Sequence, residues 1–212
     1  MENRDLGIRT TGDGSITCYS DRFKQHYHSV HGARTESEKV YLDLGYALAA
    51  ERFARIELLE VGFGTGLNAY LTALASEKVP TFYTGLEAFP IEEEEWRQFP
   101  EYLRVLHGLS WEEEHTIHPL FNVIKLRTKL EDFLPDKRFH LVYYDAFSPE
   151  AQPELWTSER FAQVYGWMEA GGILCTYCSK VLVQKNLKSA GFEVEKHPGP
   201  PHKREVIRAI KK

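Results

Sequence analysis

The stretch from Leu58 to Asn68 places an apolar segment directly before three glycines at alternate positions, Gly62, Gly64 and Gly66. The apolar segment is typical of a buried strand, and the leucines after the glycines recur at helical spacing. Glycines allow positive φ angles and a close approach of the backbone to a ligand, and the start of a helix offers free N–H groups. The stretch therefore predicts a strand, a turn and a helix of an α/β sheet that binds a nucleotide-like cofactor.

The spacing of these glycines differs from two common nucleotide-binding patterns. Dinucleotide folds use G-x-G-x-x-G, and phosphate-binding P-loops require G-x-x-x-x-G-K-S/T. Here Glu60 begins the pattern Glu-x-Gly-x-Gly-x-Gly, and no lysine follows the third glycine. The kind of cofactor therefore has to be inferred from the charged residues nearby.

Three apolar segments each end in a carboxylate, at Glu60, Glu87 and Asp145. Ligands of open α/β sheets bind beyond the carboxyl ends of the strands, so we expect these acids to line one crevice. Glu87 is placed to accept both hydroxyls of a ribose, and Glu60 to hold a cationic part of the ligand. Two carboxylates repel a pyrophosphate and attract a cation. The acids therefore favour S-adenosylmethionine as the cofactor.

Strand-like segments alternate with helical segments along most of the chain, and two further strands follow at the end. This order predicts an α/β fold with a mostly parallel seven-stranded sheet, helices on both faces and an antiparallel edge strand. We expect residues 1–35 to form a small N-terminal extension packed on the core, and residues 36–212 to form the main domain. The expected strands are 58–61, 81–87, 121–126, 139–145, 173–178, 192–196 and 204–210.

The composition is that of a globular chain: 212 residues, 42% hydrophobic and 27% charged, which is enough for one large core. No apolar run approaches the roughly 18 residues of a membrane span. The segment Met1–Asp5 has no apolar signal region, so we expect a cytoplasmic location. Cys175 and Cys178 are formally C-x-x-C, but residues three apart in a strand point to opposite faces, so these thiols should not converge on a metal. The histidines of His26–His31 do not have the spacing of a zinc site, so no metal is expected.

The net charge of −5 hides an asymmetry between two parts of the chain. Residues 87–115 contain nine acids and two bases, and residues 180–212 contain nine bases and three acids. The basic end is the part that would attract a polyanion. The other interpretation is a solvated edge strand protected by lysines.

The segment from Asp145 to Pro149 predicts a stiff loop at the end of the fourth strand. Methyl transfer to nitrogen needs a neutral amine, an aligned acceptor and a site that excludes water. Asp145 can accept an N–H from a substrate amine and stabilise positive charge as the methyl group arrives. Phe147 can cover the site or stack on a base. The alternative is that Asp145 only caps a turn.

Blocks spread over nearly the whole chain resemble the MnmC-like family of bacterial tRNA 5-methylaminomethyl-2-thiouridine methyltransferases. Within them, Gly-Phe-Gly-Thr-Gly-Leu-Asn is distinctive, and Asp-Ala-Phe-Ser-Pro stands where the family usually has Asp-Gly-Phe-Ala-Pro. The blocks are Tyr27–Ala33, Glu36–Leu42, Glu60–Asn68, Leu86–Pro90, Asp145–Thr157, and Gly199 with His202–Glu205.

The resemblance implies a class I, Rossmann-like methyltransferase that transfers a methyl group from S-adenosylmethionine to the aminomethyl group of a wobble uridine in tRNA. It implies that Asp145 handles the amine. The family often has an adenine-binding acid after the third strand, where this chain has Thr128-Lys129, and the nearest acids are Glu131 and Asp132. The expected cofactor residues are Glu36, Glu60, Gly62, Gly64, Gly66, Asn68, Glu87 and Asp132. The expected substrate residues are Phe147, Pro149, Tyr177, Lys203 and Arg204.

Family members are often fused to a flavin-dependent oxidase that prepares the amine, and this chain has no room for one. We therefore expect a separate enzyme to supply the aminomethyl group. Two other functions stay open. One is a methyltransferase of the same fold that acts on a small-molecule or protein amine, because a fold does not fix a substrate. The other is a non-catalytic binding domain, which the retained glycines and Asp145 disfavour.

Overall fold

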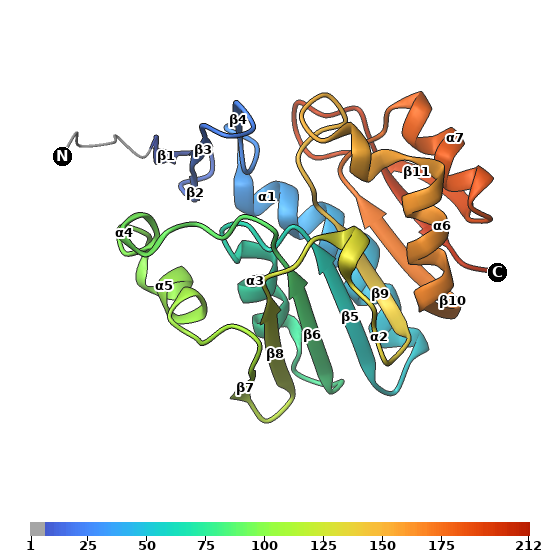
Figure 1. Ribbon diagram of the computed structural model, residues 1–212, viewed down its shortest axis with the longest axis horizontal. Helices are drawn as coiled ribbons and strands as arrows, with labels where there is room; N and C mark the ends of the chain where they lie inside the picture. Colours follow the sequence, from blue (N-terminus) through green and yellow to red (C-terminus); the bar gives the residue numbers. More distant parts are fainter. Residues whose placement is uncertain (1–6) are drawn as a thin grey trace.

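A central sheet of eight strands organises the protein, whose computed structural model describes residues 7–212 (Figure 1). The strand order is β11-β12-β10-β9-β5-β6-β8-β7. The five strands in the middle are parallel, whereas β7 and β12 run antiparallel to their neighbours. The bounds are β5 Ile56–Val61, β6 Thr81–Leu86, β7 Glu114–His118, β8 Phe121–Leu126, β9 Phe139–Tyr144, β10 Met168–Thr176, β11 Glu193–Pro198 and β12 Glu205–Ile210.

The expected count of seven strands is wrong by one, because the sequence pattern did not reveal β7. This strand contains charged and polar residues and is nowhere fully buried, so it has no apolar alternation to mark it. Its pairing with β8 holds it in the sheet. The expected antiparallel strand near the C-terminus is β12, which lies one place in from the edge because β11 covers it.

One face of the sheet is covered by a long helical segment next to α3. Its middle part, η1, is a π-helix, and Val40, Tyr41 and Leu44 on it are buried against the sheet. Gly45 makes this close approach possible, since a Cβ there would lie 3.1 Å from Cys175 Sγ. The elements on this side are α1 (Ala33–Ser37), η1 (Glu38–Tyr46), α2 (Ala47–Arg52), α3 (Leu67–Ala75), α4 (Glu93–Trp96) and α5 (Glu101–His107).

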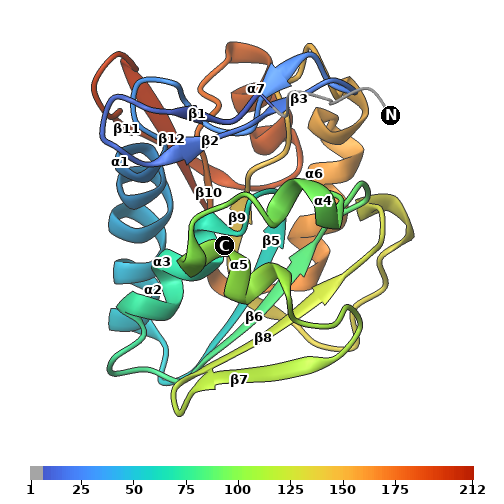
Figure 2. The ribbon, with the colours of Figure 1, turned by 90° about the vertical axis from the view of Figure 1, so that its left-hand side faces the viewer.

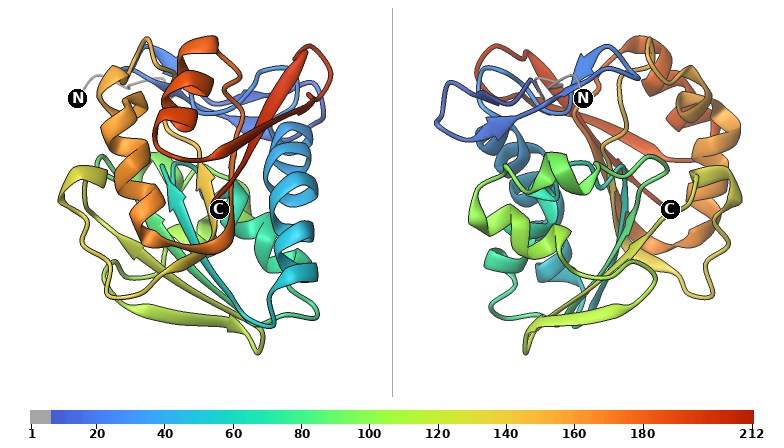
Figure 3. Two further views of the ribbon diagram at one scale, coloured as in Figure 1. Left: turned by 90° about the vertical axis from the view of Figure 1, so that its right-hand side faces the viewer. Right: turned by 60° about the vertical axis from the view of Figure 1, so that its left-hand side comes forward.

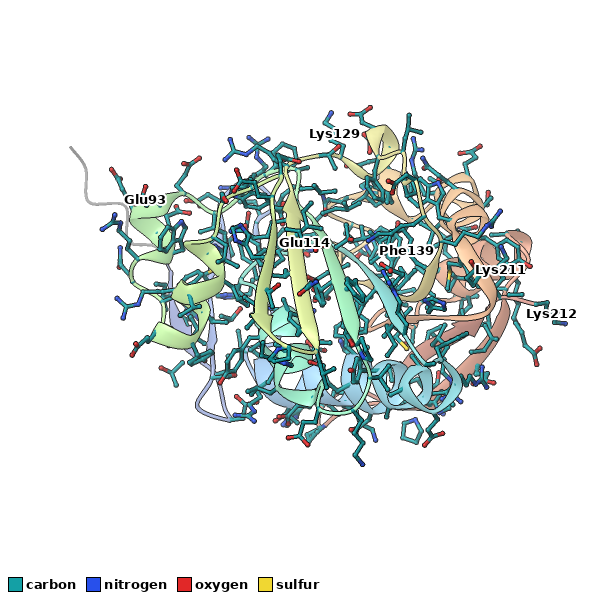
Figure 4. All side chains as sticks on the ribbon, turned by 90° about the horizontal axis from the view of Figure 1, so that it is seen from below. Glu93, Glu114, Lys129, Phe139, Lys211 and Lys212 are labelled. Carbon is teal, nitrogen blue, oxygen red and sulfur yellow. The ribbon has the colours of Figure 1, made fainter. Side chains whose placement is uncertain are left out.

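The opposite face is covered by α6 and α7, and the left view of Figure 3 shows the sheet between the two helical layers. Trp156, Phe161 and Val164 from this layer are buried against Val142 and Leu174 of the sheet. The elements here are η3 (Pro153–Trp156), α6 (Ser158–Trp167) and α7 (Val181–Ser189), and the short η2 (Leu130–Asp132) follows β8. Figure 4 shows charged side chains such as Glu93, Lys129 and Lys212 at the periphery and Phe139 inside.

The N-terminal strands lie across one end of the sheet, drawn in blue at the top of Figure 2. They form two short hairpins, from β1 (Arg9–Thr10) with β2 (Ile16–Thr17) and from β3 (Tyr19–Ser20) with β4 (Gln25–His26). The helix α1 extends from Ala33 to Ser37 and therefore crosses the expected boundary at residue 35. The division of the chain at residue 35 stays a prediction. Residues 1–6, which include the segment used to argue for the location, lie outside the described residues. Within residues 7–212, no helix is long and apolar enough to span a membrane.

Replacement of Gly166 by alanine is expected to stabilise the fold. Gly166 lies inside α6, its φ angle is not in the left-handed region, and a Cβ there would meet nothing within 4 Å. Alanine favours a helix over glycine by about 0.5–1 kcal/mol, so the melting temperature should rise by about 1–4 °C. Differential scanning calorimetry measures this, and a lowered melting temperature would contradict the packing described for α6.

Candidate functional site

A cavity of about 510 Å³ lies where the parallel strands β5, β6 and β9 end. The turn after β5 and the loops after β6, β8 and β9 contribute to its wall, together with the N-terminal segment and the C-terminal turn. The volume is in the range of sites for small molecules and cofactors. The cavity therefore lies where open α/β sheets bind their ligands.

The glycine turn forms one wall of this cavity. Its backbone comes close to the loop after β9, since a Cβ on Gly62 would lie 2.7 Å from the carbonyl oxygen of Asp145. Gly62 and Gly64 both have positive φ angles, of 91° and 51°, and both line the cavity. Gly66 lies at the start of α3 and does not line it. The two lining glycines therefore let the turn pack closely on its neighbours and present bare backbone to the cavity.

Glu87 lies opposite this turn and its carboxylate is fixed by the backbone. Its Oε2 accepts the N–H of Gly64 at 3.0 Å, and its Oε1 accepts the N–H of Phe89 at 2.9 Å. Burial raises the pKa of Glu87, and these backbone hydrogen bonds oppose the rise. Each oxygen keeps a free lone pair. The carboxylate can therefore accept two neighbouring hydroxyls from a ligand.

Glu60 is fully buried and does not line the cavity. Its Oε1 accepts a hydrogen bond of 2.8 Å from Asn68 Nδ2, and burial raises its pKa well above the usual value. Burial disfavours the ionised form of this carboxyl, so Glu60 is less able than an exposed acid to offer a charge to a ligand. From this position Glu60 can act on a ligand only through Asn68.

Asp145 follows β9 and lines the cavity. Tyr41 donates its hydroxyl to Oδ1 at 2.6 Å, and Asn68 Nδ2 donates to Oδ2 at 2.7 Å. Burial raises the pKa of Asp145 to about 7, although these two hydrogen bonds and the charge of Lys203 lower it. The group therefore changes its protonation state near neutral pH, as a general base should.

Lys203 enters the cavity from the C-terminal turn. Its ammonium pairs with the Glu36 carboxylate and lies 4.5 Å from the centre of the Tyr177 ring. The Tyr177 hydroxyl donates to the carbonyl oxygen of Ala146 at 2.9 Å. The expected residues Glu36, Tyr177 and Lys203 thus meet on one side of the cavity. Arg204 does not line it.

Phe147 forms part of an aromatic wall. Its ring stacks on Phe23 with centroids 4.4 Å apart and meets the edge of Tyr27 at 4.9 Å. Gln25 joins the same contact, because its Nε2 donates to Ser148 Oγ at 2.7 Å. The N-terminal segment thereby closes the cavity against the loop after β9. Pro149 belongs to that loop and does not line the cavity.

The loop after β8 places Glu131, and not Asp132, at the cavity wall, together with Thr128 and Lys129.

Sequence reasoning also missed several residues of the site, namely Tyr41, Phe23, Gln25 and His28. His28 Nε2 lies 2.6 Å from Thr65 Oγ1, and burial lowers its pKa to about 4, so the ring is neutral. The resemblance blocks included Tyr41 and His28, but nothing in the pattern separated them from core residues.

The residues of the cavity fit S-adenosylmethionine. The two glycines give space for a ligand, Glu87 offers two acceptors for a ribose, and Asp145 and Glu36 attract a cation. The buried Oδ1 of Asn68 on α3 has no hydrogen-bond partner among residues 7–212, so this oxygen can still accept a hydrogen bond. The described part of the chain contains no group of three or more His, Cys, Asp or Glu side chains that could hold a metal ion.

Comparison with known proteins supports this interpretation. A family model described as S-adenosyl-L-methionine-dependent methyltransferase matches residues 87–212. The tRNA 5-methylaminomethyl-2-thiouridine biosynthesis bifunctional protein MnmC of Delftia acidovorans is 27% identical over 92% of the chain, and that of Nitrosospira multiformis is 29% identical over 89%. The chain spans about a third of the length of these relatives, 33% and 34%.

Solved structures confirm the fold. The crystal structure of MNMC2 from Aquifex aeolicus superposes with a TM-score of 0.81 and 25% identity, covering 98% of this chain and 71% of that one. The magnesium protoporphyrin IX methyltransferase of Synechocystis with bound SAM gives a TM-score of 0.57 at 13% identity, covering 84% and 80%. The second likeness concerns the fold alone. The expected class I methyltransferase fold is therefore confirmed, with one strand more than expected.

Proposed function

We propose that this chain, which belongs to the family of S-adenosyl-L-methionine-dependent methyltransferases, methylates the 5-aminomethyl group of a wobble uridine in tRNA. The observation that carries the proposal is Asp145, a carboxyl with a pKa near 7 that lines the same cavity as the glycine turn. The names of the MnmC relatives supply the substrate. A tRNA substrate implies a cytoplasmic location, and we propose that a separate enzyme makes the amine before the methyl transfer.

In this proposal the cofactor lies between the glycine turn and Glu87. Gly62 and Gly64 allow its close approach, Glu87 accepts its ribose hydroxyls, and Glu36 lies on the same cavity wall. Asn68 is buried and does not line the cavity, and it acts through its hydrogen bond to Asp145. When bound, S-adenosylmethionine supplies a methyl group on a sulfonium centre, which a neutral amine displaces. Gly66 and Glu60 support the turn and Asn68 from behind. Asp132 is the acid expected to bind the adenine, but its neighbour Glu131 lines the cavity. In this proposal Glu131 binds the adenine in its place.

Asp145 prepares the amine in this reaction. An aliphatic ammonium has no lone pair, so it has to lose a proton before the nitrogen can attack. The Asp145 carboxylate accepts that proton, and the neutral amine stays hydrogen-bonded to the carboxyl group. Phe147 and Tyr177 form walls around the substrate and exclude water, with Lys203 beside them. Pro149 keeps its loop stiff, and Arg204 lies outside the cavity, where it can meet RNA.

The pH dependence of the reaction tests this role. Asp145 has to be ionised to accept a proton, and its pKa is raised to about 7, so kcat/KM should rise with pH and level off above that value. The rate at about pH 6 should be roughly a tenth of the plateau. Initial rates between about pH 5.5 and 9 measure it, and a rate that is flat through pH 7 would remove Asp145 as the base.

A second candidate is a methyltransferase for a small cationic amine. The charged residues that line the cavity are mostly carboxylates, and the whole chain has a net charge of −5, which disfavours a polyanion. The lining carboxylates are Glu36, Glu87, Glu131, Asp145 and Glu154, against the cations Lys129 and Lys203.

The two candidates separate in one competition assay. The purified chain receives labelled S-adenosylmethionine with tRNA that carries the 5-aminomethyl group, with the same tRNA lacking that group, and with free polyamines. The proposed function predicts label in the first RNA only. Label in the polyamines and none in RNA would favour the small-amine enzyme, and no label anywhere would favour a binding domain.

A further inference from the structure

The Asp145 carboxyl group is held from two sides by elements that are far apart in the sequence. Tyr41 on η1 donates to Oδ1 at 2.6 Å, and Asn68 on α3 donates to Oδ2 at 2.7 Å. The first distance lies in the range of charge-assisted O–H···O⁻ bonds. A carboxylate has about four acceptor positions, so each oxygen keeps one for a substrate.

The π-helix η1 brings Tyr41 to this position. Segments of π-helix are rare and occur frequently at functional sites. η1 has nine residues, and Tyr41 on it is 1% exposed, with its ring 4.9 Å from that of Tyr143. Gly45 on the same segment allows the helix to lie close to β9 and β10, where a Cβ would touch Cys175 and Leu141. The geometry of η1 therefore directs a buried hydroxyl at Asp145.

We infer that Tyr41 is a positioning residue for the proposed reaction, which fixes the Asp145 carboxylate with its free lone pairs toward the cavity. The inference rests on the proposed role of Asp145. Burial raises the pKa of Tyr41 well above its usual value, and the neighbouring Asp145 charge adds to this. The phenol therefore keeps its proton at every working pH, so it acts as a permanent donor and does not itself transfer a proton.

Several other groups also face Asp145 and have to stay unchanged in a test. The charges on the cavity side belong to Glu36 and Lys203, which oppose each other in their effect on the Asp145 pKa. The remaining titratable groups that interact electrostatically with Asp145 are Glu60, Tyr83 and Tyr177. A variant that removes one oxygen from Tyr41 and leaves its ring in place changes none of these charges.

Tyr41→Phe is the variant that isolates the hydroxyl. Loss of a hydrogen bond that favours the ionised form should raise the Asp145 pKa by about one unit, from about 7. The acid limb of the kcat/KM profile should move up by the same amount, with kcat/KM about five- to sixfold lower at pH 7, about ninefold lower at pH 6 and close to wild type at about pH 9.

Tyr46→Phe is the matched control. Tyr46 lies on the same π-helix and is 5% exposed, but its hydroxyl bonds Thr81 Oγ1 at 2.9 Å, away from the cavity. Both variants lose one buried hydroxyl, so both should lose similar stability in urea unfolding. Tyr46→Phe should leave the pH profile in place. An equal loss of rate at every pH in Tyr41→Phe would reduce Tyr41 to a structural residue and overturn the inference.

A direct titration separates this inference from the proposed function. Carbon-13 NMR of labelled aspartate carboxyl groups follows Asp145 without any substrate, and Asp145→Asn identifies its signal by loss. A pKa that rises in Tyr41→Phe supports the inference even if no RNA is methylated. A pKa that does not move overturns it, even if tRNA methylation is observed in the wild type.

Discussion

Replacement of Asp145 by asparagine is expected to reduce methyl transfer at pH 7 by about 10²- to 10⁴-fold, the contribution of a positioned general base. Asparagine keeps the shape and can still accept the Tyr41 hydroxyl, but it takes no proton from an ammonium substrate. The glycine turn and Glu87 are unchanged, so the affinity for S-adenosylmethionine should stay within about threefold of wild type. Single-turnover transfer of labelled methyl and calorimetric titration of the cofactor measure the two quantities.

Asp43→Asn is the control for this variant. Asp43 lies on η1 as well, but it is exposed and forms a 3.6 Å ion pair with Lys39. Such surface pairs contribute about 0–1 kcal/mol, so both rate and affinity should be unchanged. If Asp145→Asn turned over like wild type, Asp145 would have no part in the mechanism, and the proposed chemistry would fail with it.

Gly64→Val is expected to weaken cofactor binding by about 10- to 100-fold. Gly64 has a φ angle of 51°, a conformation that a β-branched residue avoids, and a Cβ there would lie 3.0 Å from Tyr27 Cδ1. Valine at this position would be strained by about 1–3 kcal/mol, and relief of the strain would shift the turn. The shift would displace the Gly64 N–H, which donates to Glu87. A cost of 1.4 kcal/mol in binding free energy lowers the affinity about tenfold. Calorimetric titration with S-adenosylmethionine measures the loss.

Gly14→Val controls for backbone strain alone. Gly14 has a φ angle of 81° and a Cβ there would meet nothing within 4 Å, in a turn that does not line the cavity. Its valine variant should lose stability without losing cofactor affinity. Wild-type affinity in Gly64→Val would show that the cofactor does not approach this turn.

The core of the fold could be predicted from sequence because the parallel strands are buried on both faces. Every residue of β5 is buried, and such strands appear as mostly apolar runs between helical patterns, which in β5 include the two acids Glu57 and Glu60. The strand β7 gave no such signal, since four of its five residues are charged or polar and none is fully buried. Pairing with β8 determines its structure, and a local pattern does not show which strands pair.

The candidate site was predictable in part for a similar reason. Acids at strand ends and alternate glycines mark the edge of the sheet where a ligand binds, and Glu87 and Asp145 do line the cavity. The same pattern does not show in which direction a side chain points. Glu60 therefore looked equivalent to Glu87, although Glu60 is buried behind Asn68. Tyr41 lay inside a resemblance block and was given no role, because the π-helical turns that direct its hydroxyl leave no periodic signal.

The expectation that the N-terminal segment packs on the core named no residue that it would contact. Its contacts depend on pairs more than 100 residues apart, such as Gln25 with Ser148. The stacked rings of Phe23 and Phe147 belong to the same contact. Sequence patterns within a short window contain no information on such pairs, so the closing of the cavity by this segment emerged only from the structure.

The proposed activity is methylation of a 5-aminomethyl uridine in tRNA by this chain. The most direct measurement incubates the purified chain with S-adenosylmethionine and tRNA that carries this group, followed by mass spectrometry of the digested nucleosides. We expect the aminomethyl nucleoside to gain one methyl group, and Asp145→Asn to abolish the gain. An unmodified nucleoside in the presence of bound cofactor would rule out the proposed activity.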